Sequence, residues 1–259
     1  MRRLLVIPTY NCQEQIGRLL QKSMETIDNE FEEVLIIDNG STDQTVENAI
    51  RIMKSTRIRA KVLQNCENIS LGGSLKTGFL YAKTNSFDFV AVLHGDDQAQ
   101  IQDLAPILNE IEVNDIDIAI GARFHSDSNL VGYSLFRKIG NRLLNLYCII
   151  STGTKIDDLI AGLNIFRVSK LNLEEIFFYP NDLTFDVHIL LRAIHQKQKI
   201  LFFPITWVEV DQVSNAKVVR QALIILALFT RYFFTKEKAL HFFKSESSYS
   251  DYNILYERK

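Results

Sequence analysis

Short apolar runs alternate with longer stretches in which apolar residues recur every three or four positions. Residues 4–7, 34–37 and 89–93 are apolar throughout, and the short runs 61–63 and 117–120 are apolar after Lys61 and Asp117. Between the first two runs, Ile16, Leu19 and Ile27 lie on one helical face. Alternation of strand and helix at this spacing predicts an α/β fold, with a mostly parallel sheet and helices on both of its faces.

The second half of the chain continues the pattern less regularly. Residues 133–150 are helical in pattern and apolar on more than one side, so we expect this helix to be sandwiched between the sheet and another element. Residues 164–168 and 200–205 read as further strands, with helices near 170–177 and 185–195. No Pro/Gly/Ser-rich linker interrupts the chain. We therefore expect one domain over 1–217, an amphipathic helical segment over 218–244, and a polar, frayed or disordered tail over 245–259.

Composition excludes several classes of protein. The chain has 259 residues, 47% of them hydrophobic, which is enough for a substantial core. A formal net charge of −2 gives no basic field, so we expect no nucleic-acid partner. The 3 cysteines have no metal-ligand spacing and favour a reducing compartment. The apolar run 222–229 is too short to span a bilayer, and we predict no transmembrane helix.

The strand at 89–93 ends in His94-Gly95-Asp96-Asp97-Gln98. Ligands of open α/β sheets bind at the carboxyl ends of the strands. The Asp96 and Asp97 carboxylates and the Gln98 amide are hard oxygen ligands suited to Mg²⁺ or Mn²⁺, which would bridge to a bound phosphate. The alternative is that Asp97 only forms a turn.

Two other loops, 8–11 and 38–43, follow strands of the same predicted sheet and can form one pocket with 94–98. Tyr10 offers an aromatic surface for a base, and Asp38 an acceptor for base or ribose donors. Gly73 opens a helix whose N–H groups can approach phosphate, and Lys76 lies one turn further on. The structural alternatives are a turn-forming Asp38, a packing Tyr10 and a solvated Lys76.

Several motifs together resemble the inverting family-two glycosyltransferases of GT-A fold, which have a Rossmann-like sheet. They are VIPTYN at 6–11, IIDNGSTDQT at 36–45, NISLGGSLKTGF at 68–79 and LHGDDQ at 93–98, followed by GARF at 121–124, FRKIGNRLLN at 136–145, DDLIAGLNIF at 157–166, FDVHILLRA at 185–193 and FFPITW at 202–207. Within that family the chain is most similar to the polyprenyl-phosphate glycosyltransferases, dolichyl-phosphate mannose synthase among them. The resemblance covers residues 3–220.

The resemblance implies roles for individual residues. Pro8, Tyr10 and Asp38 match positions that line the nucleotide, and Asp96 and Gln98 match positions that hold metal and diphosphate. Basic positions that receive the lipid phosphate correspond to Arg123 and Arg137, and a lysine near the diphosphate corresponds to Lys217. The implied ligands are a GDP- or UDP-sugar, Mg²⁺ or Mn²⁺, and a polyprenyl phosphate.

Some positions depart from the family pattern. His94 replaces the first aspartate of the metal motif, Asn39 the second aspartate of the usual DDGS, and Cys12 a glutamate. Glutamate is frequent in the family where this chain has His188, and an arginine expected after the PITW strand is absent. Neutral His94 can still ligate Mn²⁺ or act through water, and Asp97 can compensate for the lost aspartate.

The segment 218–244 combines aromatic and aliphatic residues with arginine and lysine. Such a segment suits peripheral contact with a membrane. The alternative is a terminal helix that packs on the domain or forms a homodimer. We expect a cytoplasmic protein, with any membrane contact on the cytoplasmic face.

Three hypotheses for function remain open at the level of sequence. The first is inverting sugar transfer to a polyprenyl phosphate, which needs no base, or to a glycan hydroxyl in cell-surface polysaccharide synthesis, which needs one from Asp186 or Asp158. The second is nucleotidyl transfer, although residues 8–11 lack the basic loop expected of it. The third is a catalytically weak nucleotide-sugar-binding protein in which His94, Asn39 and Cys12 have eroded the site.

Overall fold

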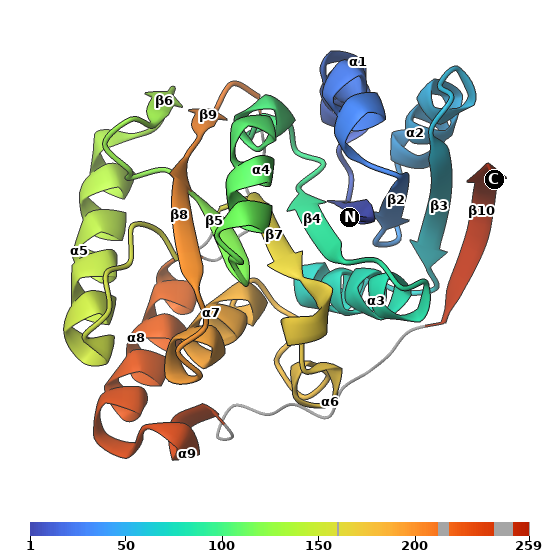
Figure 1. Ribbon diagram of the computed structural model, residues 1–259. Coiled ribbons are helices and arrows are strands. Elements are labelled where there is room, and N and C mark those ends of the chain that lie inside the picture. Colours follow the sequence, from blue (N-terminus) through green and yellow to red (C-terminus); the bar gives the residue numbers. More distant parts are fainter. Residues whose placement is uncertain (160, 212–217, 241–250, 259) are drawn as a thin grey trace.

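The computed structural model describes residues 1–159, 161–211, 218–240 and 251–258. Its centre is a sheet with the strand order β10-β3-β2-β1-β4-β7-β5-β8 (Figure 1). Pairing is parallel from β3 through β2 and β1 to β4 and between β5 and β8, whereas β7 and β10 run antiparallel to their neighbours. The strands are β1 (Arg3–Thr9), β2 (Glu33–Asp38), β3 (Arg59–Asn65), β4 (Phe89–Leu93), β5 (Ile118–Ala122), β7 (Leu163–Arg167), β8 (Ile200–Pro204) and β10 (Tyr252–Arg258).

Helices cover both faces of the sheet because alternate residues of a buried strand point to opposite sides. Leu4 and Val6 of β1 lie in one apolar core, and Leu5 and Ile7 in the other. The first core is closed by α3 (Ser70–Thr84), α6 (Leu173–Ile176), α7 (Phe185–His195), α8 (Val218–Thr235) and α9 (Glu237–Leu240). The second is closed by α1 (Gln13–Glu30), α2 (Thr45–Lys54), the short η1 (Ile101–Asp103) and α4 (Ala105–Val113). These two layers confirm the predicted α/β class.

A parallel ribbon of two short strands, β6 (Asn129–Val131) and β9 (Thr206–Val208), lies beside the main sheet (Figure 1). Gly132, directly after β6, has a φ of +74°, and a β-carbon there would stand 2.2 Å from the carbonyl oxygen of Glu209. Only glycine tolerates both conditions. The sequence pattern did not predict this ribbon, since three-residue strands leave too little periodicity.

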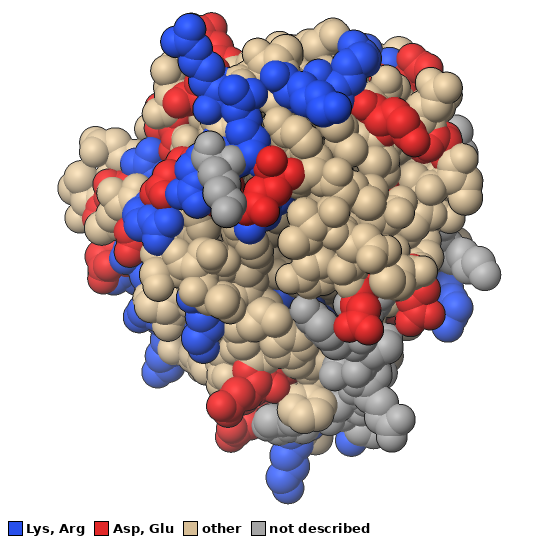
Figure 2. All heavy atoms as spheres, turned by 90° about the vertical axis from the view of Figure 1, so that its right-hand side faces the viewer, with Lys and Arg blue, Asp and Glu red and all other residues tan. Residues whose placement is uncertain are grey.

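The structure corrects three expectations. Residues 252–258 of the predicted frayed tail form β10, which pairs with β3 and carries charges of both signs at that edge (Figures 1 and 2). The helix α5 (Leu135–Thr152) is not sandwiched, because one of its faces is exposed. The helix expected over 170–177 is reduced to the turn η2 (Val168–Lys170) and the short α6. Among the described residues, no helix is both long and apolar enough to cross a membrane.

Candidate active site

The three predicted loops meet at the carboxyl ends of β1, β2 and β4. The backbone N–H of Asn11 donates to Ser41 Oγ at 2.9 Å, and the N–H of Thr42 donates to Asn11 Oδ1 at 2.9 Å. The N–H of Gly95 donates to the carbonyl of Pro8 at 3.0 Å. Sequence reasoning therefore brought the correct segments together. Tyr10, which is 41% exposed, remains open to a ligand, as its predicted role requires.

Asp38 is fully buried and already accepts hydrogen bonds inside the protein. Its Oδ2 accepts from the Ser41 backbone at 2.9 Å and from Gln64 Nε2 at 2.9 Å. These contacts support the turn-forming alternative, and nucleotide binding by Asp38 stays a prediction. The neighbouring Asn39 accepts from the Ile69 N–H at 3.0 Å while it donates to Asn68. An aspartate could not do both, which accounts physically for the departure at this position.

Several N–H groups at the start of α3 are engaged by other protein groups. The N–H groups of Ile69, Ser70 and Gly72 donate to other protein groups, and a β-carbon on Gly73 would come within 2.7 Å of the Ile69 side chain. The Lys76 ammonium is buried and donates to the carbonyls of Phe177 and Tyr179 and to Asn181 Oδ1, at 3.0, 2.6 and 2.6 Å.

These three acceptors match the three N–H donors of Lys76, and burial lowers its pKa to about 8. The Lys76 ammonium is therefore engaged inside the protein, and its assistance in phosphate binding stays a prediction. Lys76 holds the 177–181 loop against α3. Gly73 packs closely against its own helix start, and its predicted contact with the donor stays a prediction.

Asp97 pairs with two basic side chains of α1. Its φ of +63° places it in the left-handed region, and its carboxylate forms ion pairs with Lys22 at 2.5 Å and Arg18 at 3.2 Å. Arg18 also pairs with Asp211 at 2.8 Å. Two cations neutralise the Asp97 carboxylate, which supports the alternative that Asp97 is structural, and its role beside His94 stays a prediction. The Asp97 ion pairs link α1 to the loop 94–98, which is called the metal loop below.

His94 and Asp96 form the polar centre of the site. Burial raises the pKa of Asp96 and lowers the pKa of His94, and each group partly opposes the shift of the other. The Nε2 atom of His94 is buried and has no hydrogen-bond partner in the described part of the chain. A neutral imidazole with a vacant nitrogen beside a carboxylate is a suitable pair of metal ligands.

The described residues contain no cluster of three or more His, Cys, Asp or Glu side chains that could hold a metal. A divalent ion at His94 and Asp96 would thus need further oxygen ligands. Gln98 can supply one through its amide oxygen, and a bound diphosphate can supply others. The residues present therefore fit a metal that binds together with a nucleotide, and the metal itself stays a prediction.

Arg123 is buried against Asp158 in a bidentate ion pair. Its Nε donates to Oδ2 and its Nη2 to Oδ1, both at 2.8 Å, and its backbone N–H donates to Oδ2 at 2.9 Å. Burial opposes the charge of Arg123, but attraction to Asp158 outweighs it and raises the pKa of the guanidinium. The pair accounts for both residues structurally. The role of Asp158 as a base and the binding of lipid phosphate by Arg123 both stay predictions.

Arg137 lies at the start of α5 and contacts Glu209, a residue that the sequence reasoning missed. Its Nη1 donates to both carboxylate oxygens of Glu209, at 2.8 and 2.6 Å. The Trp207 indole donates to the same carboxylate at 3.1 Å, and Gln98 Nε2 lies 3.5 Å from it. Arg137 is 39% exposed, so it can still meet a ligand. The sequence signal that could have identified Glu209 is an acidic residue two positions after Trp207.

Asp186 lies in the first turn of α7, which begins beside α3, since the N–H of Gly72 donates to the Asn181 carbonyl at 2.7 Å. Neither carboxylate oxygen of Asp186 has a hydrogen-bond partner among the described residues, and burial raises its pKa to about 7. Its role as a base stays a prediction. The predicted Lys217 lies outside the described residues.

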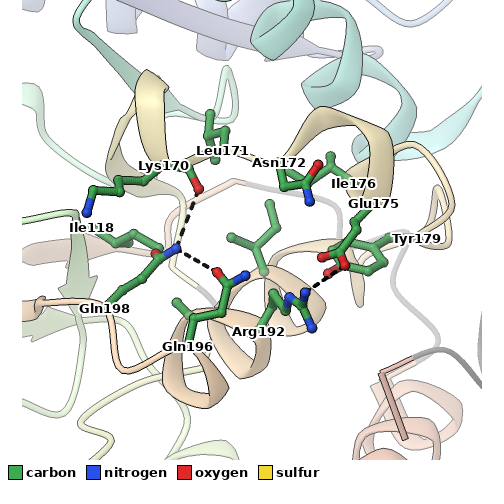
Figure 3. Close-up of a pocket in the computed structure, with 12 residues that line it drawn as sticks. Ile118, Lys170, Leu171, Asn172, Glu175, Ile176, Tyr179, Arg192, Gln196 and Gln198 are labelled. Atoms are coloured by element: carbon green, nitrogen blue, oxygen red, sulfur yellow. Dashed lines mark hydrogen bonds and ion pairs between the residues drawn. The ribbon is translucent and has the colours of Figure 1, made fainter. Parts of the chain in front are cut away.

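A hollow at the opposite end of the sheet is lined by residues of α6, α7 and the start of β5, with Glu175 and Arg192 paired at 2.6 Å (Figure 3). Its volume of about 20 Å³ suits one water molecule. Ile118, on its wall, begins β5, whereas ligands of such sheets bind where parallel strands end. The hollow is therefore not the substrate site.

Solved structures share this fold. Glucosyl-3-phosphoglycerate synthase from Mycobacterium tuberculosis in complex with UDP superposes with a TM-score of 0.61 at 14% identity, over 88% of this chain and 79% of that one. A second structure of the same enzyme contains Mn²⁺, UDP and glucosyl-3-phosphoglycerate, with the same TM-score of 0.61. At this identity the likeness establishes the GT-A fold alone.

Sequence comparison identifies the family. Dolichyl-phosphate beta-glucosyltransferase of Saccharomyces cerevisiae is 24% identical over 243 residues, covering 85% of this chain and 73% of the yeast protein. Polyprenol monophosphomannose synthase of Mycolicibacterium smegmatis is 23% identical over 233 residues, covering 87% and 86%. The sequence model of glycosyl transferase family 2 matches residues 4–173. With three loops gathered at the strand ends and this match over more than half of its length, the chain belongs to glycosyl transferase family 2 and is a glycosyltransferase.

Proposed function

We propose that this enzyme transfers a sugar from a nucleoside-diphosphate sugar to a polyprenyl phosphate, with inversion and with help from a divalent metal. An oxygen of the acceptor phosphate attacks the anomeric carbon, and the bond from that carbon to the donor diphosphate breaks. The nucleoside diphosphate leaves with the electron pair. Because the attacking oxygen is already anionic, no proton has to be removed and no base is required.

The donor would bind at the three gathered loops. Tyr10 is exposed there and can stack on the base. Asp96, His94 and Gln98 would hold Mg²⁺ or Mn²⁺ together with the diphosphate, and the bound ion would neutralise charge on the leaving group. The named relatives support the acceptor class, because they are a dolichyl-phosphate glucosyltransferase and a polyprenol monophosphomannose synthase.

The exposed face of α5 is the observation that carries the lipid acceptor. Six large apolar side chains on this one helix are between 52% and 87% exposed: Leu135, Phe136, Ile139, Leu143, Leu146 and Ile150. They recur at helical spacing, so they form one ridge along α5. Exposed apolar surface of this extent marks a site of interaction with a protein or a membrane. The ridge begins beside Arg137, where the acceptor phosphate would bind.

Charge favours a membrane over a protein partner for this ridge. Neighbouring α8 adds exposed Val219, Leu223, Phe233 and Phe234, and Tyr147 and Thr230 join the two helices by a hydrogen bond of 2.5 Å. Neither helix contains aspartate or glutamate, and their cations are Arg137, Lys138, Arg142, Arg220 and Arg231. The β10 edge, by contrast, mixes both signs (Figure 2). Apolar side chains among cations suit an anionic lipid surface, which extends the predicted membrane contact from 218–244 to α5.

The test is direct transfer. Purified protein is mixed with Mg²⁺ or Mn²⁺, polyprenyl phosphate and a panel of labelled UDP- and GDP-sugars, and label that enters the organic phase is counted. Asp96→Asn should abolish transfer. Asp88→Asn is the matched control, since Asp88 is exposed and precedes β4 at the end opposite to Asp96. It should retain full activity.

Parallel reactions with a soluble glycan acceptor, or with nucleoside triphosphates in place of the labelled sugars, separate the rivals. Label that enters only water-soluble glycan would show that the acceptor is a glycan hydroxyl and not a lipid phosphate. Asp186 would then be tested as the base that removes the proton of that hydroxyl. Release of pyrophosphate from nucleoside triphosphates would indicate nucleotidyl transfer. If neither wild type nor Asp96→Asn transfers sugar, and the two proteins bind nucleotide equally, the proposal fails and a catalytically weak protein is indicated.

A further inference from the structure

The Glu209 carboxylate joins three parts of the site. It accepts from Arg137 of α5 at 2.8 and 2.6 Å and from the Trp207 indole of β9 at 3.1 Å. Gln98 of the metal loop approaches it at 3.5 Å, a long contact. The Glu209 side chain is only 16% exposed, so these interactions lie largely out of water. One carboxylate thus contacts both Arg137, the proposed ligand of the acceptor phosphate, and Gln98 of the metal loop.

The backbone around Glu209 connects the same parts. The N–H of Val208 donates to the carbonyl of Gln98 at 2.9 Å, and the N–H of Glu209 donates to the carbonyl of Val131 at 2.9 Å. Val131 ends β6, and α5 begins four residues later. In Figure 1 the β6–β9 ribbon therefore stands between the metal loop and the start of α5. The ribbon holds the backbones of Gln98 and Val131 in place, and the Glu209 carboxylate holds the side chains of Gln98 and Arg137.

The arginine keeps donors for a ligand while Glu209 holds it. The hydrogen bonds between Arg137 and Glu209 use Nη1 alone. Its guanidinium also lies 4.7 Å over the Tyr133 ring. A planar guanidinium anchored at one nitrogen and supported on a ring can present its other N–H groups to a phosphate in a fixed direction. A freely rotating arginine could not define where the phosphate sits.

We propose that Glu209 is a positioning residue that sets the separation between the acceptor phosphate on Arg137 and the donor diphosphate at the metal loop. The inference rests on the proposed function and deepens it. Glu209 does not touch the reacting atoms. It acts through Arg137 and Gln98, and its effect on rate comes from alignment of the two substrates.

Kinetics of three variants test the role. Glu209→Gln and Glu209→Asp should each raise KM for prenyl phosphate about tenfold and lower kcat by about ten- to a hundredfold, because a misplacement near 1 Å is enough to cost that much. The affinity for nucleoside diphosphate should not change. Glu175→Gln is the matched control, since Glu175 also pairs with an arginine at 2.6 Å but borders the hollow of Figure 3. It should leave both constants unchanged.

The aspartate variant separates alignment from charge. It keeps the carboxylate but is one methylene shorter, so it should behave like Glu209→Gln if reach matters. Wild-type kinetics in Glu209→Asp with a defect in Glu209→Gln would overturn the alignment role in favour of simple charge. Wild-type kinetics in both would overturn it entirely. Lower unfolding stability with normal kcat and KM in the folded fraction would show a purely structural role.

Fluorescence supplies a readout that needs no turnover. Trp207 is the only tryptophan of the chain and bonds to Glu209 directly. Titration with a short-chain prenyl phosphate should change its emission in wild type and not in Glu209→Gln. No change in wild type would overturn the inference. If wild type turns over no prenyl phosphate but inorganic phosphate still gives the Glu209-dependent change, the proposed acceptor has failed and the link from Arg137 to Glu209 has not.

Discussion

Asp158 holds the Arg123 guanidinium by two parallel hydrogen bonds of 2.8 Å, in a pocket where both side chains are almost fully buried. Arg123 also lies 5.1 Å over the Trp207 ring. The pair thus supports the ribbon that carries Glu209. A buried pair of this kind is costly to break, because the remaining charge has no water to solvate it.

The first prediction follows from this pair. Asp158→Asn should lower the free energy of unfolding by about 3–5 kcal/mol, since it leaves Arg123 buried without a counter-charge. Urea denaturation measures the change. Asp157→Asn is the control, because its partner Lys155 is 79% exposed, and the loss there should stay under about 1 kcal/mol. Equal losses in the two variants would contradict the assignment.

The second prediction concerns Asp186 and its neighbour on α7, His188. Burial raises the pKa of Asp186 to about 7 and lowers the pKa of His188 to about 4. Between pH 4 and 7 the folded protein keeps a proton on Asp186 that the unfolded chain loses, so Asp186 makes stability fall as pH rises. His188 has the opposite effect between its folded pKa and the ordinary histidine value, because there the unfolded chain binds the extra proton. The two contributions offset each other.

Single variants separate the two contributions. Relative to wild type, Asp186→Asn should gain stability steadily from pH 4 to pH 7, by several kcal/mol in total, as expected from a shift of this size. Relative to wild type, His188→Gln should be the more stable protein at pH 4 and the less stable one as the pH approaches the ordinary pKa of histidine. Thermal unfolding at matched ionic strength measures both. A pH-independent difference between Asp186→Asn and wild type would show that Asp186 is not buried as a neutral acid.

The sequence was sufficient for the central strands and for the meeting of the three loops. Fully buried parallel strands appear as uninterrupted apolar runs, and their carboxyl ends must lie at one edge. It was insufficient for β10, whose residues 252–258 mix polar and apolar types and become a strand only beside the β3 edge. The exposed face of α5 was missed because an apolar residue reads the same whether it meets protein or lipid.

Side-chain direction limited the predictions within the site. Asp97 looked equivalent to Asp96, but its positive φ turns it toward Lys22 and Arg18. Lys76 looked solvated or phosphate-binding, but its three acceptors come from a loop about a hundred residues later in the chain. Likewise, the pairing of Arg137 with Glu209 spans 72 positions. Local pattern contains no information on such contacts, which only the packed chain creates.

The third prediction concerns metal choice at His94. An imidazole nitrogen suits Mn²⁺ and later transition metals better than Mg²⁺, which prefers oxygen. With nucleoside diphosphate present, wild type should bind Mn²⁺ more tightly than Mg²⁺ by roughly tenfold or more, and His94→Asp should narrow the ratio. Competition of Mg²⁺ against the Mn²⁺ electron paramagnetic resonance signal measures it. An unchanged ratio in His94→Asp would mean that the imidazole is not a ligand.

The fourth prediction concerns the apolar ridge on α5. Phe136 and Leu143 are 87% and 62% exposed, so the double variant Phe136→Gln, Leu143→Gln should leave the free energy of unfolding nearly unchanged. It should weaken binding to vesicles that contain anionic lipid by about tenfold, because two large side chains no longer enter the interface. Co-sedimentation with vesicles measures the bound fraction, and added salt should weaken wild-type binding further.

Val113→Gln is the matched control for the ridge, since Val113 is 72% exposed but lies at the end of α4. It should bind vesicles as wild type does. In the transfer assay, the ridge variant should lose activity toward long-chain polyprenyl phosphate in vesicles and keep it toward a short prenyl phosphate in solution. The reason is that the ridge brings the enzyme to the lipid, whereas Arg137 binds the phosphate. Equal loss of activity toward both acceptors would place Phe136 and Leu143 in the active site itself. Unchanged vesicle binding by the double variant would show that the α5 ridge does not bind the membrane.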